Sequence, residues 1–252
     1  MNRILKAVGS VLAVAVLSAG MAAQTSAARY DNDIQAQVSK RLEDKKQFRN
    51  VQSTVEDGIV TLTGTVDLYQ QKLDAAKRVR KAEHVSGVRN LIEVASSVPD
   101  DQLAAELDRK LYYDRMGYEN LFNYVTVSVN DGVATLTGET MNYVGRDSAV
   151  SLANNMPGVK DVVDQIKVAP VSSFDDDIRM AATGVLYRDP VLSRYAADPA
   201  RPIRIVVDNG HLTLYGTVEN AMDKNIAGIR AGQVFGVFSV QNQLQVANTN
   251  RS

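Results

Sequence analysis

The 252-residue chain contains no cysteine and only two histidines. Without cysteine it can form no disulfide and no thiolate site, and it cannot be lipidated at a cysteine beside a leader cleavage point. His84 and His211 do not stand at spacings typical of metal ligands or of a catalytic triad, and no phosphate-binding loop or nucleophile elbow is present. The sequence therefore predicts a protein that is not an enzyme and that holds no metal and no cofactor.

The chain also lacks a large excess of charge of either sign. Its 28 basic and 29 acidic residues make up 23% of the sequence, and hydrophobic residues make up 45%. These fractions are close to those of ordinary globular proteins, so wholesale disorder is not expected. A nearly neutral chain has no undirected attraction to nucleic acid or to anionic lipid. We expect no nucleic-acid partner, and any binding of an anionic surface must come from a local patch.

One apolar run stands out, from Ala7 to Ala19, and two basic residues precede it. At about 13 residues the run is shorter than the ~20 that a membrane-spanning helix needs. Small residues follow it, which completes the pattern of a secretory signal. We expect a signal peptide over residues 1–27, cleaved near Ala27 or Ala28, and no transmembrane segment in the mature chain.

The rest of the sequence repeats one pattern three times. Each copy opens with an aspartate that can cap a helix, followed by three apolar residues spaced four apart, as in an amphipathic helix. The three openings are Asp31 with Ile34, Val38 and Leu42, then Asp100 with Leu103, Leu107 and Leu111, then Asp175 with Ile178, Ala182 and Leu186. The same argument assigns the acidic run from Asp175 to Asp177 to helix capping and not to a metal site.

Each copy continues with alternating apolar residues on either side of a turn dipeptide that favours a hairpin. The turns are Asp57-Gly58, Asp131-Gly132 and Asn209-Gly210, and the returning strands close at Gly64, Gly138 and Gly216. A second helix with small residues and a last strand follow, and the last strand ends 30 residues after the closing glycine in all three copies. This regularity indicates a repeated structural unit.

The predicted fold class is α+β, with three tandem α-β-β-α-β modules. Each module is expected to have a three-stranded mixed sheet with two helices on one face. The order of the strands beyond the hairpin stays open. We place the domains at residues 28–95, 99–169 and 174–247, because short segments rich in serine and proline separate them.

The copies share a pattern that resembles the BON domain. In the first copy it reads Asp57-Gly58-Ile59-Val60-Thr61-Leu62-Thr63-Gly64, followed after a helix by Val85-Ser86-Gly87-Val88-Arg89-Asn90-Leu91-Ile92-Glu93-Val94. The resemblance covers nearly all of the mature chain. It implies a periplasmic protein similar to the osmotically inducible BON proteins, a family associated with phospholipid interfaces and with envelope integrity under stress.

Differences between the copies are the place to look for function. In the first copy basic residues cluster within ten positions of the second helix, the densest positive charge in the chain: Lys72, Lys77, Arg78, Arg80 and Lys81. A solvated helix face accounts for such a cluster, and cations also favour a helix C-terminus. An anionic lipid surface is the alternative, because each basic residue near it adds about 1 kcal/mol.

The segment between the first helix and the first strand lengthens from copy to copy, as tolerated surface loops do. In the second copy it is aromatic, and in the third it is rich in arginine, whose fork matches phosphate oxygens. The candidate contacts there are Tyr112, Tyr113, Arg115 and Tyr118, then Arg188, Arg194, Tyr195, Arg201 and Arg204. The interpretation that we favour at this point is structural: the aromatic residues cover their own module, and the arginine-rich segment is a loop tied to its module.

Two functions from different classes remain. The first is a peripheral protein that binds anionic phospholipid headgroups through the basic helix of the first copy or the loop of the third. The second is a protein-interaction or chaperone-like module that contacts other envelope proteins. Polysaccharide binding is weaker, because no aromatic platform repeats between copies. The oligomeric state is not readable from the sequence.

Overall fold

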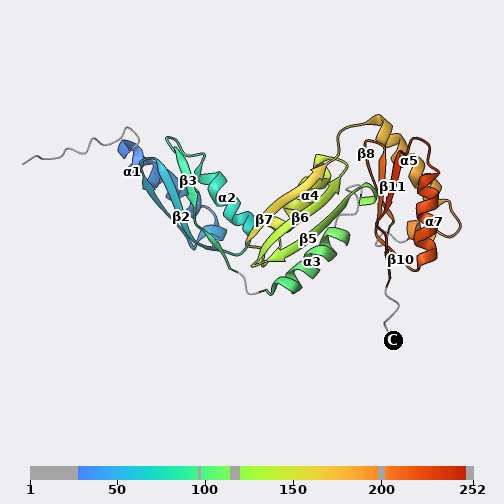
Figure 1. Ribbon diagram of the computed structural model, residues 1–252. Helices are drawn as coiled ribbons and strands as arrows, with labels where there is room; N and C mark the ends of the chain where they lie inside the picture. The colour runs from blue at the N-terminus through green and yellow to red at the C-terminus, as the bar shows by residue number, and fades with distance from the viewer. Residues whose placement is uncertain (1–27, 96–97, 114–119, 198–201, 248–252) are drawn as a thin grey trace, which may run out of the picture.

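A computed structural model describes residues 28–95, 98–113, 120–197 and 202–247. The three modules follow one another in a row, and in each of them the helices cover one face of a small sheet (Figure 1). The expected α+β class and the order α-β-β-α-β are therefore confirmed. The expected signal peptide lies outside the described residues.

The first module contains η1 (Ala28–Tyr30), α1 (Asp31–Glu43), η2 (Lys46–Phe48), β1 (Val51–Glu56), β2 (Ile59–Val66), α2 (Tyr69–Val79), β3 (Gly87–Asn90) and β4 (Glu93–Val94). The second contains α3 (Asp100–Tyr113), η3 (Asn120–Phe122), β5 (Tyr124–Asn130), β6 (Val133–Thr140), α4 (Tyr143–Asn154) and β7 (Asp161–Val168). The third contains α5 (Ser173–Tyr187), α6 (Arg194–Ala197), β8 (Arg204–Asp208), β9 (His211–Tyr215), β10 (Thr217–Val218), α7 (Ala221–Gly232), β11 (Ser239–Asn242) and β12 (Gln245–Val246).

The strand that returns from the hairpin is the middle strand of each sheet. It pairs antiparallel with the strand before the turn and parallel with the last strand, in the orders β1-β2-β3, β5-β6-β7 and β11-β9-β8. A parallel pair needs a crossover connection, which α2, α4 and α7 supply. This fixes the strand order that the sequence left open.

The predicted apolar stripes form the cores. Ile34, Val38 and Leu42 of α1 are buried against β2 and α2, and the corresponding residues of α3 and α5 are buried in their own modules. The small residues Ala75, Ala149 and Ala227 are fully buried, so the second helix lies close against the sheet. Each module therefore has a separate core.

The aspartate that opens each module does not cap its helix as expected. Its two carboxylate oxygens accept hydrogen bonds from both backbone N–H groups of the hairpin turn, for example from Asn209 at 3.0 Å and Gly210 at 2.8 Å to Asp175. Asp31 and Asp100 bind their own turns in the same way. Consecutive turn residues with positive φ point their amides in one direction and form an anion-binding concavity. The aspartate therefore joins the first helix to the hairpin, and Ser172 caps α5 instead.

The backbone conformation explains why the closing positions are glycine. Gly64 and Gly138 have φ of 110° and 117°, and a Cβ there would lie 2.0 and 2.1 Å from the backbone oxygens of Asn50 and Tyr124. Only glycine fits such a position without displacing the neighbouring strand.

Contacts between neighbouring modules use aromatic side chains. Tyr69 of α2 packs against the second core, and burial together with its hydrogen bond to Asp161 raises the pKa of Tyr69 to about 12. Between the second and third modules the ring of Tyr124 stacks on that of Tyr215 with 3.8 Å between their centroids.

The aromatic segment of the second module was expected to cover its own module, and this expectation is wrong for its described part. Leu121 and Phe122 of η3 pack against the core of the third module, and the ring of Tyr112 lies 4.5 Å from the guanidinium carbon of Arg204. The third module offers these residues a partly buried contact with its core, which a single sequence does not reveal.

Candidate functional site

The densest positive charge of the described chain lies on the first module, in a groove between the ends of α1 and α2. The groove has a volume of about 460 Å³. Its lining residues are Arg41, Lys45, Gln47, Phe48, Asp74, Lys77, Arg78 and Lys81. Five cations and one carboxylate thus face a common space, which we call the basic groove.

The helix spacing explains why these cations meet. Ala75 and Val79 of α2 are buried, so Asp74, Lys77 and Arg78 fall on the neighbouring flank of the helix. Phe48 is buried beneath the groove. The Nη2 of Arg41 donates to the backbone oxygen of Lys81 at 3.1 Å and holds the end of α2 against α1.

The cations of the basic groove are available to a ligand. Within the described residues, none of the five forms an ion pair. The carboxylate of Asp74 already accepts a hydrogen bond from the side-chain amide of Gln70, at 2.9 Å. An uncompensated group of ammonium and guanidinium ions in an open groove is suited to phosphate or another anion.

Three of the five predicted basic residues of the first module line the groove, and two do not. Lys72 is half-buried, and its backbone oxygen accepts a hydrogen bond from Asn90 at 2.8 Å. Arg80 is exposed just after α2 and does not line the groove. Arg41 and Lys45 were not predicted from the sequence, because only the packing of α1 against α2 brings them to the cluster.

The candidates of the second module lie near the third. Tyr112 faces Arg204, as described above, and Tyr113 lies in the last turn of α3. Arg115 and Tyr118 fall outside the described residues.

Arg204 is only 4% exposed, and its Nη1 donates to the backbone oxygens of Asn120 and Asn123, at 3.0 Å each. Burial lowers the pKa of Arg204 and raises that of its neighbour Tyr187. In this structure the guanidinium of Arg204 joins the second and third modules.

Arg194 and Tyr195 hold α6 against the start of α7. Arg194 pairs with Glu219 at 3.2 Å and with Asp223, and the hydroxyl of Tyr195 also donates to Asp223. The same hydroxyl accepts a hydrogen bond from the backbone N–H of Glu219 at 2.8 Å. These groups are engaged within the module, whereas Arg188 is exposed after α5 and Arg201 lies outside the described residues.

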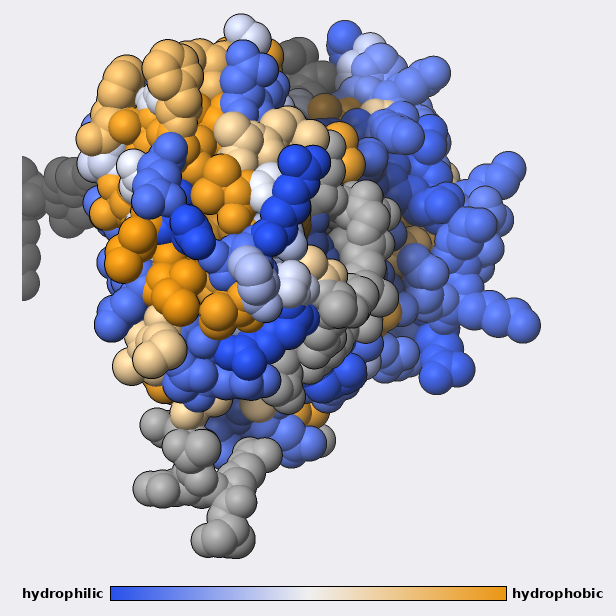
Figure 2. Space-filling view, turned by 90° about the vertical axis from the view of Figure 1, so that its right-hand side faces the viewer, coloured by the Kyte–Doolittle hydropathy of each residue, from blue (hydrophilic) through white to orange (hydrophobic). Residues whose placement is uncertain are grey.

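The third module instead exposes large apolar side chains that the sequence analysis did not single out. Figure 2 shows them gathered on the face at the far end of the row of modules. The most exposed members from this module are Met180, Met222, Ile229, Phe235 and Phe238. The clearest sequence signal is at Ile229 and Phe238, where both other copies carry polar residues.

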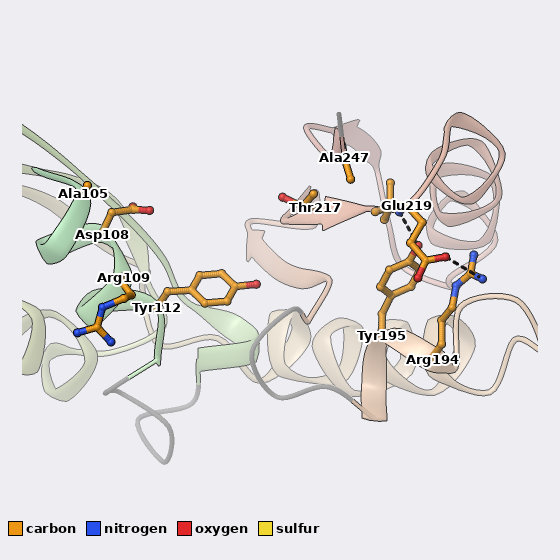
Figure 3. A pocket seen from close by; sticks show the side chains of 10 residues that line it. Ala105, Asp108, Arg109, Tyr112, Arg194, Tyr195, Thr217, Glu219 and Ala247 are labelled. Carbon is orange, nitrogen blue, oxygen red and sulfur yellow. Dashed lines mark hydrogen bonds and ion pairs between the residues drawn. The ribbon is translucent and has the colours of Figure 1, made fainter. Parts of the chain in front are cut away.

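A second hollow, of about 660 Å³, lies between the second and third modules (Figure 3). Asp108, Arg109 and Tyr112 of α3 line one side, and Arg194 and Glu219 line the other. Its charges are of both signs, and Arg194 and Glu219 already pair with each other. It therefore offers no excess charge to an ionic ligand.

The described residues contain no group of three or more histidine or acidic side chains placed to hold a metal ion. None of the described helices is both long and apolar enough to cross a bilayer.

The comparisons with known proteins agree with the repeated motif. The model of the BON domain matches residues 30–96, 99–170 and 188–248. The chain belongs to the BON-domain family. This confirms the resemblance that the turn and closing-strand residues predicted.

Among characterised relatives, the BON chain is 27% identical over 147 residues to the osmotically-inducible protein Y of Escherichia coli K12. The match covers 54% of this chain and 72% of that protein. Among solved structures, the C-terminal domain of CdsD, a structural protein of the Chlamydia trachomatis type III secretion system, is 14% identical with a TM-score of 0.25, covering 86% of this chain and 98% of that one. The PrgH periplasmic domain is 12% identical with a TM-score of 0.22, covering 79% and 96%.

Proposed function

We propose that this BON protein is exported to the periplasm, has no enzymatic activity, and binds anionic phospholipid headgroups at the membrane surface through the basic groove. The observation that carries the proposal is a set of five cations around one groove that form no ion pair with any described residue. The leader-like N-terminus supports export, and the name of the osmotically-inducible relative supports a role in the envelope under osmotic or other stress. The domain limits 28–95, 99–169 and 174–247 stay predictions.

The physical basis is local charge. Each cation near an anionic surface contributes about 1 kcal/mol, so a group of four or five is enough for reversible binding even though the whole chain is nearly neutral. The Debye length is about 8 Å at physiological ionic strength, so the attraction weakens as salt rises. The long side chains in the groove can follow a mobile headgroup without a change in the fold.

Vesicle flotation of the chain from Ala28 onward tests the proposal. We expect the protein to float with vesicles that contain phosphatidylglycerol or cardiolipin at low salt, and to stay behind with phosphatidylcholine alone. A variant that combines Arg41→Gln, Lys77→Gln, Arg78→Gln and Lys81→Gln should lose most of the binding.

A matched control removes the same charge elsewhere. Arg89, Arg109, Lys160 and Lys167 are exposed and lie outside the groove, so their replacement by Gln should leave most of the binding intact. Equal losses of vesicle binding in the two variants would mean that net charge alone drives the binding, and would contradict a binding site in the groove. Absence of flotation under all conditions would reject phospholipid binding.

A further inference from the structure

The third module has a groove at the place that corresponds to the basic groove, but its lining is apolar. The volume is about 440 Å³, and the lining residues are Asp189, Pro190, Val191, Ile226, Ile229 and Arg230. Counted from the closing glycines Gly64 and Gly216, the residues Ile226, Ile229 and Arg230 take the places of Asp74, Lys77 and Arg78. We call this hollow the apolar groove.

The charges of the apolar groove cancel. Counted from the first aspartate of each module, Asp189 takes the place of Lys45. Its carboxylate accepts a hydrogen bond from the Nε of Arg230 at 2.7 Å, and the backbone N–H of Val191 donates to it at 2.8 Å. The groove therefore has no unpaired cation to attract an anionic bilayer, in contrast to the basic groove.

Exposed apolar side chains occur along α7 and just after it, and we call Phe235 the apolar projection. Phe235 follows the end of α7 and is 96% exposed, and Met222 and Ile229 on α7 are 70% and 62% exposed. At the Ile229 position the other modules carry Lys77 and Ser151, and at the Phe235 position they carry Glu83 and Pro157, so the fold requires neither isoleucine nor phenylalanine there. Exposed apolar residues that the fold does not need mark an interaction surface.

In a pair of copies, the apolar projection of each chain can fill the apolar groove of the other. At 1.5 Å per residue, Ile229 and Ile226 lie about 5 and 9 Å along α7 before its last residue, Gly232, and Phe235 follows three residues after that end. A two-fold axis passing the exposed end of α7 near Gly232 would exchange the two positions and place each Phe235 over the apolar groove of the other copy. Gly232 is exposed, and a Cβ built on it would meet no atom within 4 Å, so the helices have room to approach.

We propose that the face of α7 with the apolar groove is the contact of a symmetric homodimer, with Phe235 of each copy seated in the apolar groove of the other. The same patch then serves on both subunits, as in two-fold contacts generally. The paired charges of Asp189 and Arg230 keep the facing surfaces neutral, so two copies do not repel each other. This proposal does not depend on lipid binding by the first module.

Sedimentation of the chain from Ala28 onward over a wide range of concentration tests the dimer. We expect a reversible monomer–dimer equilibrium, and Phe235→Glu should weaken it by about 30-fold, the effect of losing a central aromatic anchor. Leu91→Glu is the matched control, because Leu91 is 56% exposed on the first module and far from the face, and it should leave the equilibrium unchanged.

Crosslinking tests the position of the axis. Because the natural chain has no cysteine, Gly232→Cys introduces a single thiol beside the expected axis and should give a disulfide-linked dimer on mild oxidation, whereas Leu91→Cys should not. A chain that stays monomeric at all concentrations overturns the proposal. If the chain is monomeric and Phe235→Glu abolishes vesicle flotation, the proposal is overturned and the face binds lipid. If the chain is monomeric and Phe235→Glu abolishes capture of another protein, the proposal is overturned and the face binds that protein.

Discussion

The first and third modules build the same groove and line it with opposite chemistry. In both, the second helix and the segment after the first helix enclose the hollow. The pair Lys45 and Arg78 leaves two cations uncompensated in the first module, whereas Asp189 and Arg230 form an ion pair in the third. A few substitutions on a constant backbone thus change an anion-binding groove into a surface suited to apolar contact.

The difference shows which parts of the repeat are free to vary. The buried stripe of the first helix, the turn-binding aspartate and the closing glycine serve the same structural purpose in both modules. The groove residues lie outside these contacts. Fold and surface chemistry are therefore separable, and variants of each kind should have separate effects.

The largest expected effect comes from the shared turn-binding aspartate. Asp175 is 1% exposed, so Asp175→Ala leaves the buried amide of Gly210 and the part-buried amide of Asn209 without an acceptor and should cost about 3 kcal/mol. Asp31 is only half-buried, so water can replace part of the hydrogen bonding that Asp31→Ala removes from the turn amides. We expect this variant to lose about half as much free energy of unfolding. Thermal unfolding of the two variants measures the difference.

Asp177→Ala is the control for that comparison, since Asp177 is exposed on the same turn of α5. It should change the melting temperature little. If Asp31→Ala destabilises as strongly as Asp175→Ala, burial does not set the contribution of this aspartate.

The next effect concerns the groove itself. Lys45→Asp copies the third module by placing a carboxylate where it can pair with Arg78. Because it removes one cation and neutralises another, it should weaken binding to anionic vesicles by about 2 kcal/mol, or roughly 30-fold. Titration with vesicles containing phosphatidylglycerol measures the change.

Lys160→Asp makes the same change in net charge on the second module, outside the groove. It should weaken binding only slightly. If Lys160→Asp weakens binding as much as Lys45→Asp, the charge of the groove residues does not determine which ligand the groove binds.

Much of the fold follows from sequence because its determinants are local. The apolar stripe at Ile34, Val38 and Leu42, the Asp-Gly turn and the fixed distance to the last strand all lie within one copy. The role of Asp31 was not predictable. An aspartate at a helix start can accept hydrogen bonds either from its own helix, as a cap, or from another segment, and only the packed structure brings the turn at Asp57 to it.

The candidate site was predictable only in part. A run of basic residues on one helix indicated Lys77, Arg78 and Lys81, whereas Arg41 and Lys45 join them through the packing of α1. The guanidinium of Arg204 made it a candidate to bind phosphate, but it is buried and donates instead to carbonyl oxygens of the preceding module. Contacts between modules leave no periodic signal in a single sequence.

The smallest expected effect is a difference in acid sensitivity. Hydrogen bonds from the backbone N–H of Val191 and from Arg230 hold the pKa of Asp189 below its ordinary value. A carboxyl whose pKa is lower in the folded state stabilises the protein above its unfolded pKa of about 4, and that contribution is lost as pH falls through the folded value. Asp189→Asn should therefore lower stability at neutral pH and flatten its decline in acid, as measured by urea unfolding from neutral pH downward. Since Lys45 occupies the corresponding position of the first module, Lys45→Gln should leave the acid profile unchanged. A parallel shift of the whole profile in Asp189→Asn would mean that the side chain acts through packing and not through its charge.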